Sequence, residues 1–354
     1  MKTLKSTSKA RERYIPLLAT FALAVYLGVG WYLITAENET HSSSGFGVAS
    51  GQYIDDSRQH ENLDLRIVQE VSYPSTPLSK IQVLESENGI EKSLIQFSVK
   101  VDKLEEFGLM YLPAGEPPQG GFPVIILLHA YQHPDEYTTT GSYETDMAHY
   151  AQNGFAVIKP DFRGQGLSRS VGQPEGANYA MAYNSDTMSL ISAVKQTPYL
   201  KPTAINVWGH SMGAYIGLRA SVLSDDIKSA ILLAGPVASF SSTFDRYHAP
   251  SDIGNPVAGQ IKDRMLLKYG TPSANPNFWY NASPINFVNQ REVYYQIHVG
   301  ALDFVVPPQF SAELDLKLSS LGRDHGFYQY PTGDHDLLGD RLNIWKRSLE
   351  VLVR

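Results

Sequence analysis

The sequence predicts an α/β protein with a mostly parallel sheet and helices on both faces of that sheet. Short apolar runs alternate with helical segments from about Leu94 to the end of the chain, which is the pattern of parallel strands joined by helices. One of these runs, Pro123–His129, is apolar up to its histidine, as in strands buried on both faces. A third observation is the serine of Gly209–Gly213 (GHSMG), which lies between such a run and a helical segment.

The predicted elements follow in a regular order along the chain. Residues 94–101 and 107–112 alternate in polarity and predict a hairpin. Further strands are expected at 123–129, 155–159, 204–208, 229–234, 294–299 and 327–330, and helices at 143–153, 184–196, 214–220, 310–321 and 341–353. Residues 236–292 form a long insertion with a predicted helix at 260–269, which we expect to act as a cap or pocket wall. Most aromatic residues of this insertion are expected to pack it onto the core.

Composition excludes several classes of site. The chain has 354 residues, a net charge of −7 and no cysteine. Disulfides, a thiolate nucleophile and a Cys-ligated zinc are therefore excluded. The acidic balance shows no nucleic-acid footprint, and no nucleic-acid partner is expected. No cofactor and no metal is expected either.

The N-terminal region predicts a membrane anchor. Residues 1–13 hold five basic residues against one acidic residue, and residues 14–34 are almost entirely apolar. Spanning a bilayer takes roughly 20 apolar residues, and Tyr14, Trp31 and Tyr32 lie where interfacial aromatic residues are common. We expect an uncleaved signal anchor with a cytoplasmic N-terminus and the rest of the chain outside, periplasmic or extracellular. Ala36 leaves cleavage of a signal peptide as the alternative.

A tether and an irregular lead-in follow this segment. Residues 35–60 are rich in serine, glycine and charge, which favours a flexible linker. Residues 61–92 are of mixed polarity and contain Pro74 and Pro77, and they are expected to be irregular. The globular domain is predicted to span residues 61–354.

Three residues have the spacing of a catalytic triad. Ser211 at a strand-to-helix turn is the pattern of a nucleophile elbow, whose strained turn exposes the hydroxyl and aims the Met212 N–H at a developing oxyanion. Asp303 and His335 each follow a later predicted strand, and the carboxyl ends of parallel strands meet at one edge of the sheet. In that arrangement His335 is the base for Ser211, and Asp303 orients the imidazole. The motif alone also occurs by chance, so its partners decide its meaning.

The residues from about Leu94 onward resemble an α/β hydrolase, and most closely the catalytic domain of the prolyl oligopeptidase (S9) family and related esterases. The likeness is carried by the elbow and by the segments Asn153–Val157, Pro160–Gly166, Ala282–Ile285, Leu302–Pro307 and Gly333–His335. The resemblance implies an α/β-hydrolase fold, a Ser211-His335-Asp303 triad and a serine hydrolase that forms an acyl-enzyme. It also implies that the loop after residue 128 supplies the second oxyanion donor.

The sequence departs from the family pattern at two sites. Ala214 takes the place of a second glycine after the elbow, and His129–Pro134 replaces a glycine-rich loop. The second oxyanion donor is therefore open among the Ala130 N–H, the Tyr131 N–H and the Tyr131 hydroxyl. About sixty residues of lead-in cannot hold a β-propeller, which leaves an esterase possible beside a peptidase.

Other polar residues have simpler expected roles. His129 and His133 lie on a strand end and a loop, and no partner motif for zinc accompanies them. His210 is expected to be a packed turn residue, and Asp334 and Asp336 to shape the loop around His335. Asp161 and Arg163 are expected to form a structural ion pair.

We therefore expect a membrane-anchored serine hydrolase that cleaves an ester or a short-peptide amide. The alternatives are a carboxylesterase, lipase-like or deacetylase activity on a small ester, and a non-catalytic binding domain on the same scaffold. The expected partners are a small ester or peptide substrate and the lipid bilayer.

Overall fold

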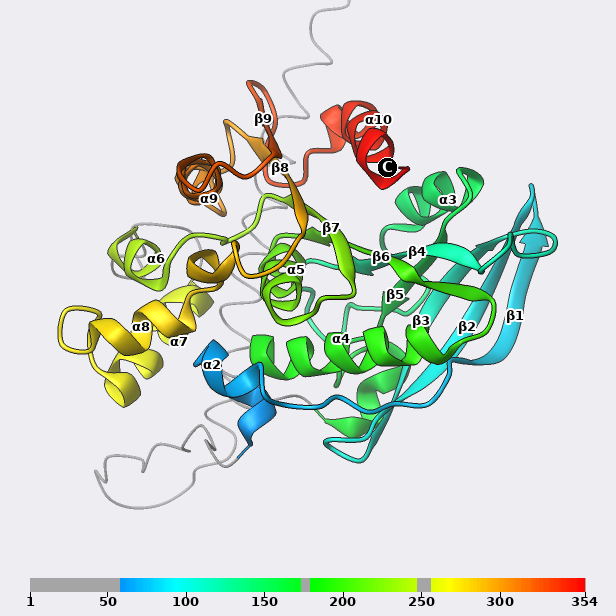
Figure 1. The fold of residues 1–354 in the computed structure, drawn as a ribbon, viewed down its shortest axis with the longest axis horizontal. Helices are drawn as coiled ribbons and strands as arrows, with labels where there is room; N and C mark the ends of the chain where they lie inside the picture. Colours follow the sequence, from blue (N-terminus) through cyan, green and yellow to red (C-terminus); the bar gives the residue numbers. More distant parts are fainter. Residues whose placement is uncertain (1–57, 173–178, 247–255, 354) are drawn as a thin grey trace, which may run out of the picture. The chain divides into compact units, whose positions relative to one another are not determined.

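The computed structural model describes residues 58–172, 179–246 and 256–353 (Figure 1). The predicted basic N-terminus, the predicted membrane segment 14–34 and nearly all of the predicted linker lie outside the described residues. Among the residues that are described, no helix has the length and apolar character needed to cross a bilayer.

A mixed sheet of nine strands organises the described part of the chain, in the order β1-β2-β3-β5-β4-β6-β7-β8-β9. Strands β1 to β3 pair antiparallel, as do β3 and β5, and all other pairs are parallel. The strands are β1 (Ser79–Glu87), β2 (Ile90–Val99), β3 (Leu104–Pro113), β4 (Phe122–Leu128), β5 (Ala156–Pro160), β6 (Leu200–His210), β7 (Ile227–Leu233), β8 (Tyr294–Gly300) and β9 (His325–Tyr330). This is the mostly parallel sheet expected of an α/β hydrolase.

Helices cover both faces of this sheet (Figure 1). The longer helices are α3 (Glu144–Gln152), α4 (Tyr179–Gln196), α5 (Met212–Leu223), α7 (Pro256–Tyr269), α9 (Pro308–Ser320) and α10 (Arg341–Leu352). The short ones are η2 (Gln59–Glu61), α2 (Leu65–Val68), η3 (Gly166–Val171), α6 (Phe240–Arg246), α8 (Pro276–Ala282), η5 (Pro284–Phe287) and η6 (Leu338–Asp340). Core residues of α4, α5 and α9 belong to one face, and those of α3 and α10 to the other.

Strand β4 shows how the sequence produces this three-layer arrangement. Successive side chains of a strand point to opposite faces. Val124, Ile126 and Leu128 therefore pack in the core with α4 and α5, whereas Ile125 and Leu127 pack in the core with α3 and α10. All five are fully buried, and burying each such side chain contributes about 1.5–3 kcal/mol. A continuous apolar run is thus required by burial on both faces.

The expectation for residues 61–92 was wrong, because this stretch contains α2 and the edge strand β1. All nine residues of β1 are exposed, so the strand has no buried face to mark it in the sequence. It is held through main-chain pairing with β2 from Ser79↔Gln96 to Glu87↔Ile90. Burial therefore does not require an alternation of apolar and polar residues along this edge strand.

The segment before β1 is fastened to the domain by buried arginines. Arg219 of α5 is 1% exposed and donates to the carbonyl oxygens of Leu63 and Asn62 at 3.2 and 2.5 Å. Arg163, after β5, contacts Glu61 with a nitrogen–oxygen distance of 3.3 Å. Residues 61–63 thereby supply hydrogen-bond acceptors to two cations that the fold has removed from water.

The excursion between β7 and β8 carries α6, α7, α8 and η5. Its aromatic residues form a small core of their own, in which Phe244 and Trp279 lie with ring centroids 5.0 Å apart. Leu63 and Met181 belong to the same core. The packing role expected for these aromatic residues is therefore observed for Phe244 and Trp279, which are buried.

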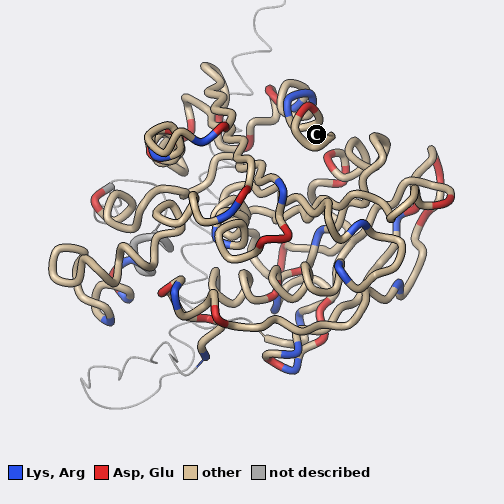
Figure 2. The backbone as a smooth tube through the Cα atoms, viewed as in Figure 1, with Lys and Arg blue, Asp and Glu red and all other residues tan. Residues whose placement is uncertain are grey.

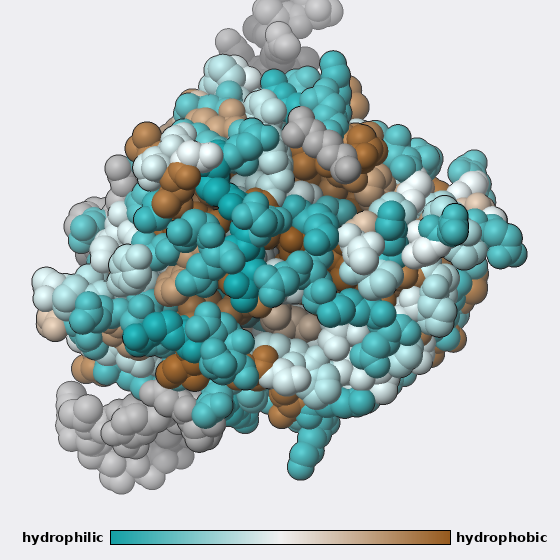
Figure 3. All heavy atoms as spheres, viewed as in Figure 1, coloured by the Kyte–Doolittle hydropathy of each residue, from teal (hydrophilic) through white to brown (hydrophobic). Residues whose placement is uncertain are grey.

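The described part of the chain carries both signs of charge. Lysine and arginine are interspersed with aspartate and glutamate along the described chain (Figure 2). The face seen in Figure 3 is mostly hydrophilic, with hydrophobic residues in small separate groups.

Candidate active site

Ser211 lies at a strained turn between β6 and α5. Its backbone has φ 55° and ψ −117°, a conformation that a residue with a side chain rarely adopts. Gly209 and Gly213 make the turn possible: a Cβ at Gly209 would overlap the Gly213 carbonyl, and a Cβ at Gly213 the Leu128 carbonyl. The Ser211 N–H donates to Leu233 O at 2.8 Å, which ties the turn to β7. These are the features of a nucleophile elbow.

The structure brings Ser211, His335 and Asp303 into one hydrogen-bonded row. His335 Nε2 lies 3.0 Å from Ser211 Oγ, and His335 Nδ1 lies 2.8 Å from Asp303 Oδ2. A carboxylate oxygen can only accept, so Nδ1 carries the proton and Nε2 is left to accept from the serine hydroxyl. That is the tautomer in which a histidine can take a proton from serine.

The acid is held by its own loop. Asp303 is 4% exposed, and its Oδ1 accepts from the backbone N–H groups of Val305 and Val306 at 2.9 and 2.8 Å. The loops after β8 and β9 also contact each other, since Leu302 N donates to Gly333 O at 2.9 Å. Asp334 instead accepts from Leu337 N at 3.0 Å, which agrees with its expected role in shaping the loop.

Two loops offer N–H groups near Ser211. Met212 is the first residue of α5, and the first N–H groups of a helix have no partner within the helix. The Ala130 N–H already donates to the Tyr143 hydroxyl at 3.1 Å, so this member of the expected donor set is occupied. Tyr131, the other expected residue, is 49% exposed.

The residue after Tyr131 is fixed by side chains from two other segments. Gln132 O accepts from Gln165 Nε2 at 2.9 Å, and Gln132 Nε2 donates to Ser142 Oγ at 3.0 Å. With Ala130 bound to Tyr143, both neighbours of Tyr131 are fixed in place. A preorganised backbone is what an oxyanion site requires.

His210 has contacts that the sequence did not predict. The residue is 3% exposed, as expected of a packed turn residue. Its Nε2 lies 2.9 Å from the backbone oxygen of His335, and its Nδ1 lies 2.8 Å from the Tyr143 hydroxyl. Burial, and then the proximity of His335, lowers the pKa of His210 to about 4, so this ring is neutral near pH 7. No sequence spacing indicates these contacts.

Two further expectations concern residues near the site. His129 is fully buried, its Nδ1 contacts Ala130 O at 2.7 Å, and burial lowers its pKa to about 3. Its ring stacks on Tyr137 with centroids 4.6 Å apart, which is a packing role. The expected Asp161–Arg163 ion pair was wrong: Asp161 accepts from Tyr137 Oη at 2.8 Å and from Thr139 Oγ1 at 2.5 Å.

Arg163 is instead the centre of a buried acidic cluster. Its guanidinium donates to Asp102 at 2.7 Å and to Asp186, and it lies 3.7 Å from Glu106. Burial alone would raise the pKa of Asp102, but hydrogen bonds from His60 and the charge of Arg163 lower it to about 2. The cluster therefore binds the β2–β3 turn to the loop after β5.

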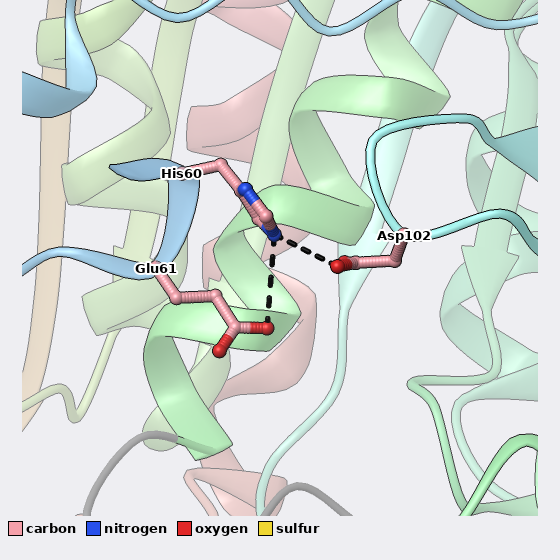
Figure 4. Close-up of side chains that lie close together, drawn as sticks. All are labelled: His60, Glu61 and Asp102. Carbon is pink, nitrogen blue, oxygen red and sulfur yellow. Dashed lines mark hydrogen bonds and ion pairs between the residues drawn. The ribbon is translucent and has the colours of Figure 1, made fainter. Parts of the chain in front are cut away.

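Within the described residues, His60, Glu61 and Asp102 form a group with the spacing of metal ligands (Figure 4). His60 Nε2 lies 2.8 Å from Asp102 Oδ1 and 4.0 Å from Glu61 Oε1. However, Arg163 and Arg58 approach Glu61 Oε1 to 3.3 and 3.5 Å, so two guanidiniums already neutralise these carboxylates. A divalent cation would face two positive charges here, and the group does not fit a metal site.

Comparisons with known proteins agree with this architecture. Residues 125–277 match the family described as serine aminopeptidase, S33. The uncharacterized peptidase YtmA of Bacillus subtilis is 26% identical over 189 residues, covering 52% of this chain and 66% of the relative. Dipeptidyl-aminopeptidase B of Aspergillus niger is 26% identical over 244 residues, covering 64% of this chain but only 25% of the relative.

Solved structures share the fold. An acetyl xylan esterase from Paenibacillus sp. R4 has a TM-score of 0.63 at 17% identity, covering 86% of this chain and 96% of that chain. The acylaminoacyl peptidase of Pyrococcus horikoshii has a TM-score of 0.57 at 16% identity, covering 78% of this chain and 50% of that chain. The chain therefore has the α/β-hydrolase fold, and it is similar to serine hydrolases that include peptidases of the S9 type. It spans about a quarter to two thirds of the length of these curated relatives.

Proposed function

We propose that Ser211, His335 and Asp303 are the catalytic triad of this hydrolase. The observation that carries the proposal is the row of two contacts, 3.0 Å from Ser211 Oγ to His335 Nε2 and 2.8 Å from His335 Nδ1 to Asp303 Oδ2. Both distances are within hydrogen-bond reach, which is the geometric requirement for nucleophile, base and orienting acid.

The reaction follows from these positions. His335 Nε2 removes the proton of Ser211 Oγ as this oxygen attacks the substrate carbonyl, and the Nδ1 proton remains on the bond to Asp303. The resulting imidazolium then gives its proton to the leaving alcohol or amine, which leaves an acyl group on Ser211. A water molecule activated by the same imidazole releases the acid and restores the serine.

The negative charge on the carbonyl oxygen needs donors in place before the reaction. The Met212 N–H at the start of α5 is the proposed first donor, and Tyr131, through its N–H or its hydroxyl, the second. Removing one such donor typically costs about 10²–10³-fold in kcat. The Ala130 N–H is bound to Tyr143, so it is not proposed as the second donor.

The proposed substrate is an ester or the amide of a short peptide. The names of the relatives, a peptidase and a dipeptidyl-aminopeptidase, support the peptide amide. The alternative is a small ester cleaved by carboxylesterase, lipase-like or deacetylase activity, because an acetyl xylan esterase shares the fold along nearly all of its length. Both substrates use the same serine chemistry.

A fluorophosphonate probe tests the triad directly. The wild-type protein should be labelled at Ser211, and Ser211→Ala should lose labelling and on the order of 10⁴–10⁶-fold in kcat. Ser320→Ala is the matched control, because the side chain of this exposed serine bonds, within the described part of the chain, only to the nearby Lys317 carbonyl at 2.7 Å. Wild-type turnover by Ser211→Ala would refute the assignment.

A panel of p-nitrophenyl esters and aminoacyl amides separates the two substrate classes, and a non-catalytic domain would cleave neither.

We also propose that residues 14–34 anchor the protein in a membrane, with the hydrolase domain outside the cytoplasm. The support is the sequence: an apolar run of spanning length follows five basic residues. An extracytoplasmic substrate would follow from this placement.

A further inference from the structure

A continuous path of hydrogen bonds joins the loop after β4 to the loop after β9. Ala130 N lies 3.1 Å from the Tyr143 hydroxyl, which lies 2.8 Å from His210 Nδ1. The other nitrogen of His210, Nε2, lies 2.9 Å from the backbone oxygen of His335. The path therefore begins beside Tyr131 and ends on His335 itself.

Each proton along this path has one possible position. The His335 carbonyl can only accept, so His210 Nε2 carries the proton of the neutral ring. His210 Nδ1 is then an acceptor, and the Tyr143 hydroxyl must donate to it. The oxygen of Tyr143 still has a lone pair, which accepts from the Ala130 N–H. Each group can act only as the donor or the acceptor assigned to it here, so the hydrogen bonds of the path have a single possible arrangement.

The middle of the path is buried at His210, and one of its residues has a strained backbone. His210 is 3% exposed, and burial raises the pKa of Tyr143, so both side chains remain neutral near pH 7. The charged or titratable groups facing His210 include Tyr143, His335, Arg341 and Asp303. Tyr143 has φ 66°, an uncommon conformation for a bulky residue that must be held by its surroundings.

We propose that Tyr143 and His210 are positioning residues that set the oxyanion loop and the catalytic base relative to each other. The inference rests on the proposed triad and goes beyond it, because neither residue touches the reacting atoms. His210 immediately precedes Ser211. The oxyanion loop and the base His335 are therefore both connected to the turn that carries the nucleophile. A misplacement of a catalytic group by about 1 Å can reduce the reaction rate by about 10²-fold. A path that fixes the loop and the base relative to each other therefore matters for the rate.

Removing one hydroxyl tests the path. In Tyr143→Phe both the Ala130 N–H and His210 Nδ1 lose their partner, and we expect kcat to fall by about 10- to 100-fold. KM should change by less than about threefold, because the ground-state contacts of the substrate are untouched. Tyr150→Phe is the matched control: it removes one hydroxyl from a buried tyrosine of α3, the helix that begins directly after Tyr143, and among the described residues this hydroxyl bonds to neither loop. Its kcat should match the wild-type value.

Two substitutions of His210 separate the two ends of the path. The amide nitrogen of His210→Gln can take the place of Nε2 and donate to His335 O, whereas the amide oxygen of His210→Asn can take the place of Nδ1 and accept from Tyr143. We expect the acid limb of the pH profile of kcat/KM to stay in place in His210→Gln and to move in His210→Asn. The double variant Tyr143→Phe/His210→Gln should lose no more activity than the worse single variant, because the bond that His210→Gln breaks is already lost in Tyr143→Phe.

These outcomes are separate from the fate of the triad proposal. If the wild-type protein is not labelled by the fluorophosphonate, the triad assignment fails. If it is labelled at Ser211 but Tyr143→Phe keeps wild-type kcat, the positioning inference alone is wrong. Should Tyr143→Phe not fold, the two His210 variants decide the question: identical pH profiles in both, with losses only in melting temperature, would show a purely structural role.

Discussion

The carboxylate of Asp303 divides its hydrogen bonds between two tasks. Oδ1 accepts two backbone N–H groups of its own loop, and Oδ2 accepts the proton of His335 Nδ1. The two bonds to Oδ1 fix the carboxylate, and the single bond to Oδ2 fixes the imidazole of His335. Asp334, one residue from His335 in the sequence, uses its Oδ1 to accept from Leu337 N and has a different role.

Replacing each acid by asparagine distinguishes these roles. Asp303→Asn should reduce kcat by about 10⁴-fold, because an amide group cannot hold His335 in the required tautomer. Asp334→Asn and Asp336→Asn retain an acceptor oxygen and should stay close to wild type. Steady-state kinetics and circular dichroism on all three variants provide the measurement. A large loss in Asp334→Asn together with a mild one in Asp303→Asn would move the acid to Asp334.

Some residues of the site could be predicted from the sequence, and others could not. Ser211, Asp303 and His335 could be selected because each follows a predicted strand and because the family resemblance fixes their order. Tyr143 and His210 are 67 residues apart and belong to no motif, so no pattern connects them. The ion-pair partners of Arg163 could not be predicted either, because they come from distant segments of the chain. The expected partner, the nearby Asp161, does not pair with it.

At the scale of elements, the ends of β8 and β9 approach each other closely. Gly300, the last residue of β8, has no room for a Cβ, which would overlap the carbonyl oxygens of Gly333 and Asp334. This approach brings the acid loop against the histidine loop. A side chain at Gly300 would therefore push apart the two loops that hold Asp303 and His335.

Gly300→Ala tests this contact. We expect a loss of about 1–3 kcal/mol in unfolding free energy, and a fall in kcat larger than any change in KM. Gly339→Ala provides the control, since none of the described atoms lies within 4 Å of a Cβ built there. Denaturant unfolding and kinetics on both variants give the comparison. Equal behaviour of the two variants would mean that the loops can separate at no cost.

Elements with a buried face were predictable, and the exposed edge was not. Strand β4 and helices α5 and α10 were expected close to their observed limits, because each buries a definite set of apolar residues. Strand β1 was missed since all of its residues are exposed, and it is held mainly through main-chain pairing with β2.

At the scale of the whole molecule, the proposed anchor can be tested by fractionation. The full chain should sediment with membranes and resist carbonate extraction, because residues 14–34 are apolar for a spanning length. A chain beginning at residue 58 should be soluble and active without detergent, and it keeps Arg58 and His60 beside Asp102. Recovery of the full chain from the soluble cytoplasmic fraction would exclude the anchor, and a soluble exported form trimmed near Ala36 would indicate a cleaved signal.

The attachment of residues 61–63 to two buried arginines has a mechanical consequence. A pull on the chain at residue 58 is borne by the contact of His60 with Asp102 and by the contacts of residues 61–63 with Arg163 and Arg219, before it reaches β1. Arg219 belongs to α5, the helix that begins with Met212 directly after the elbow. Tension along the predicted tether is therefore transmitted to the helix that carries the proposed oxyanion donor, and the exposed edge strand β1 bears none of that load until those contacts break.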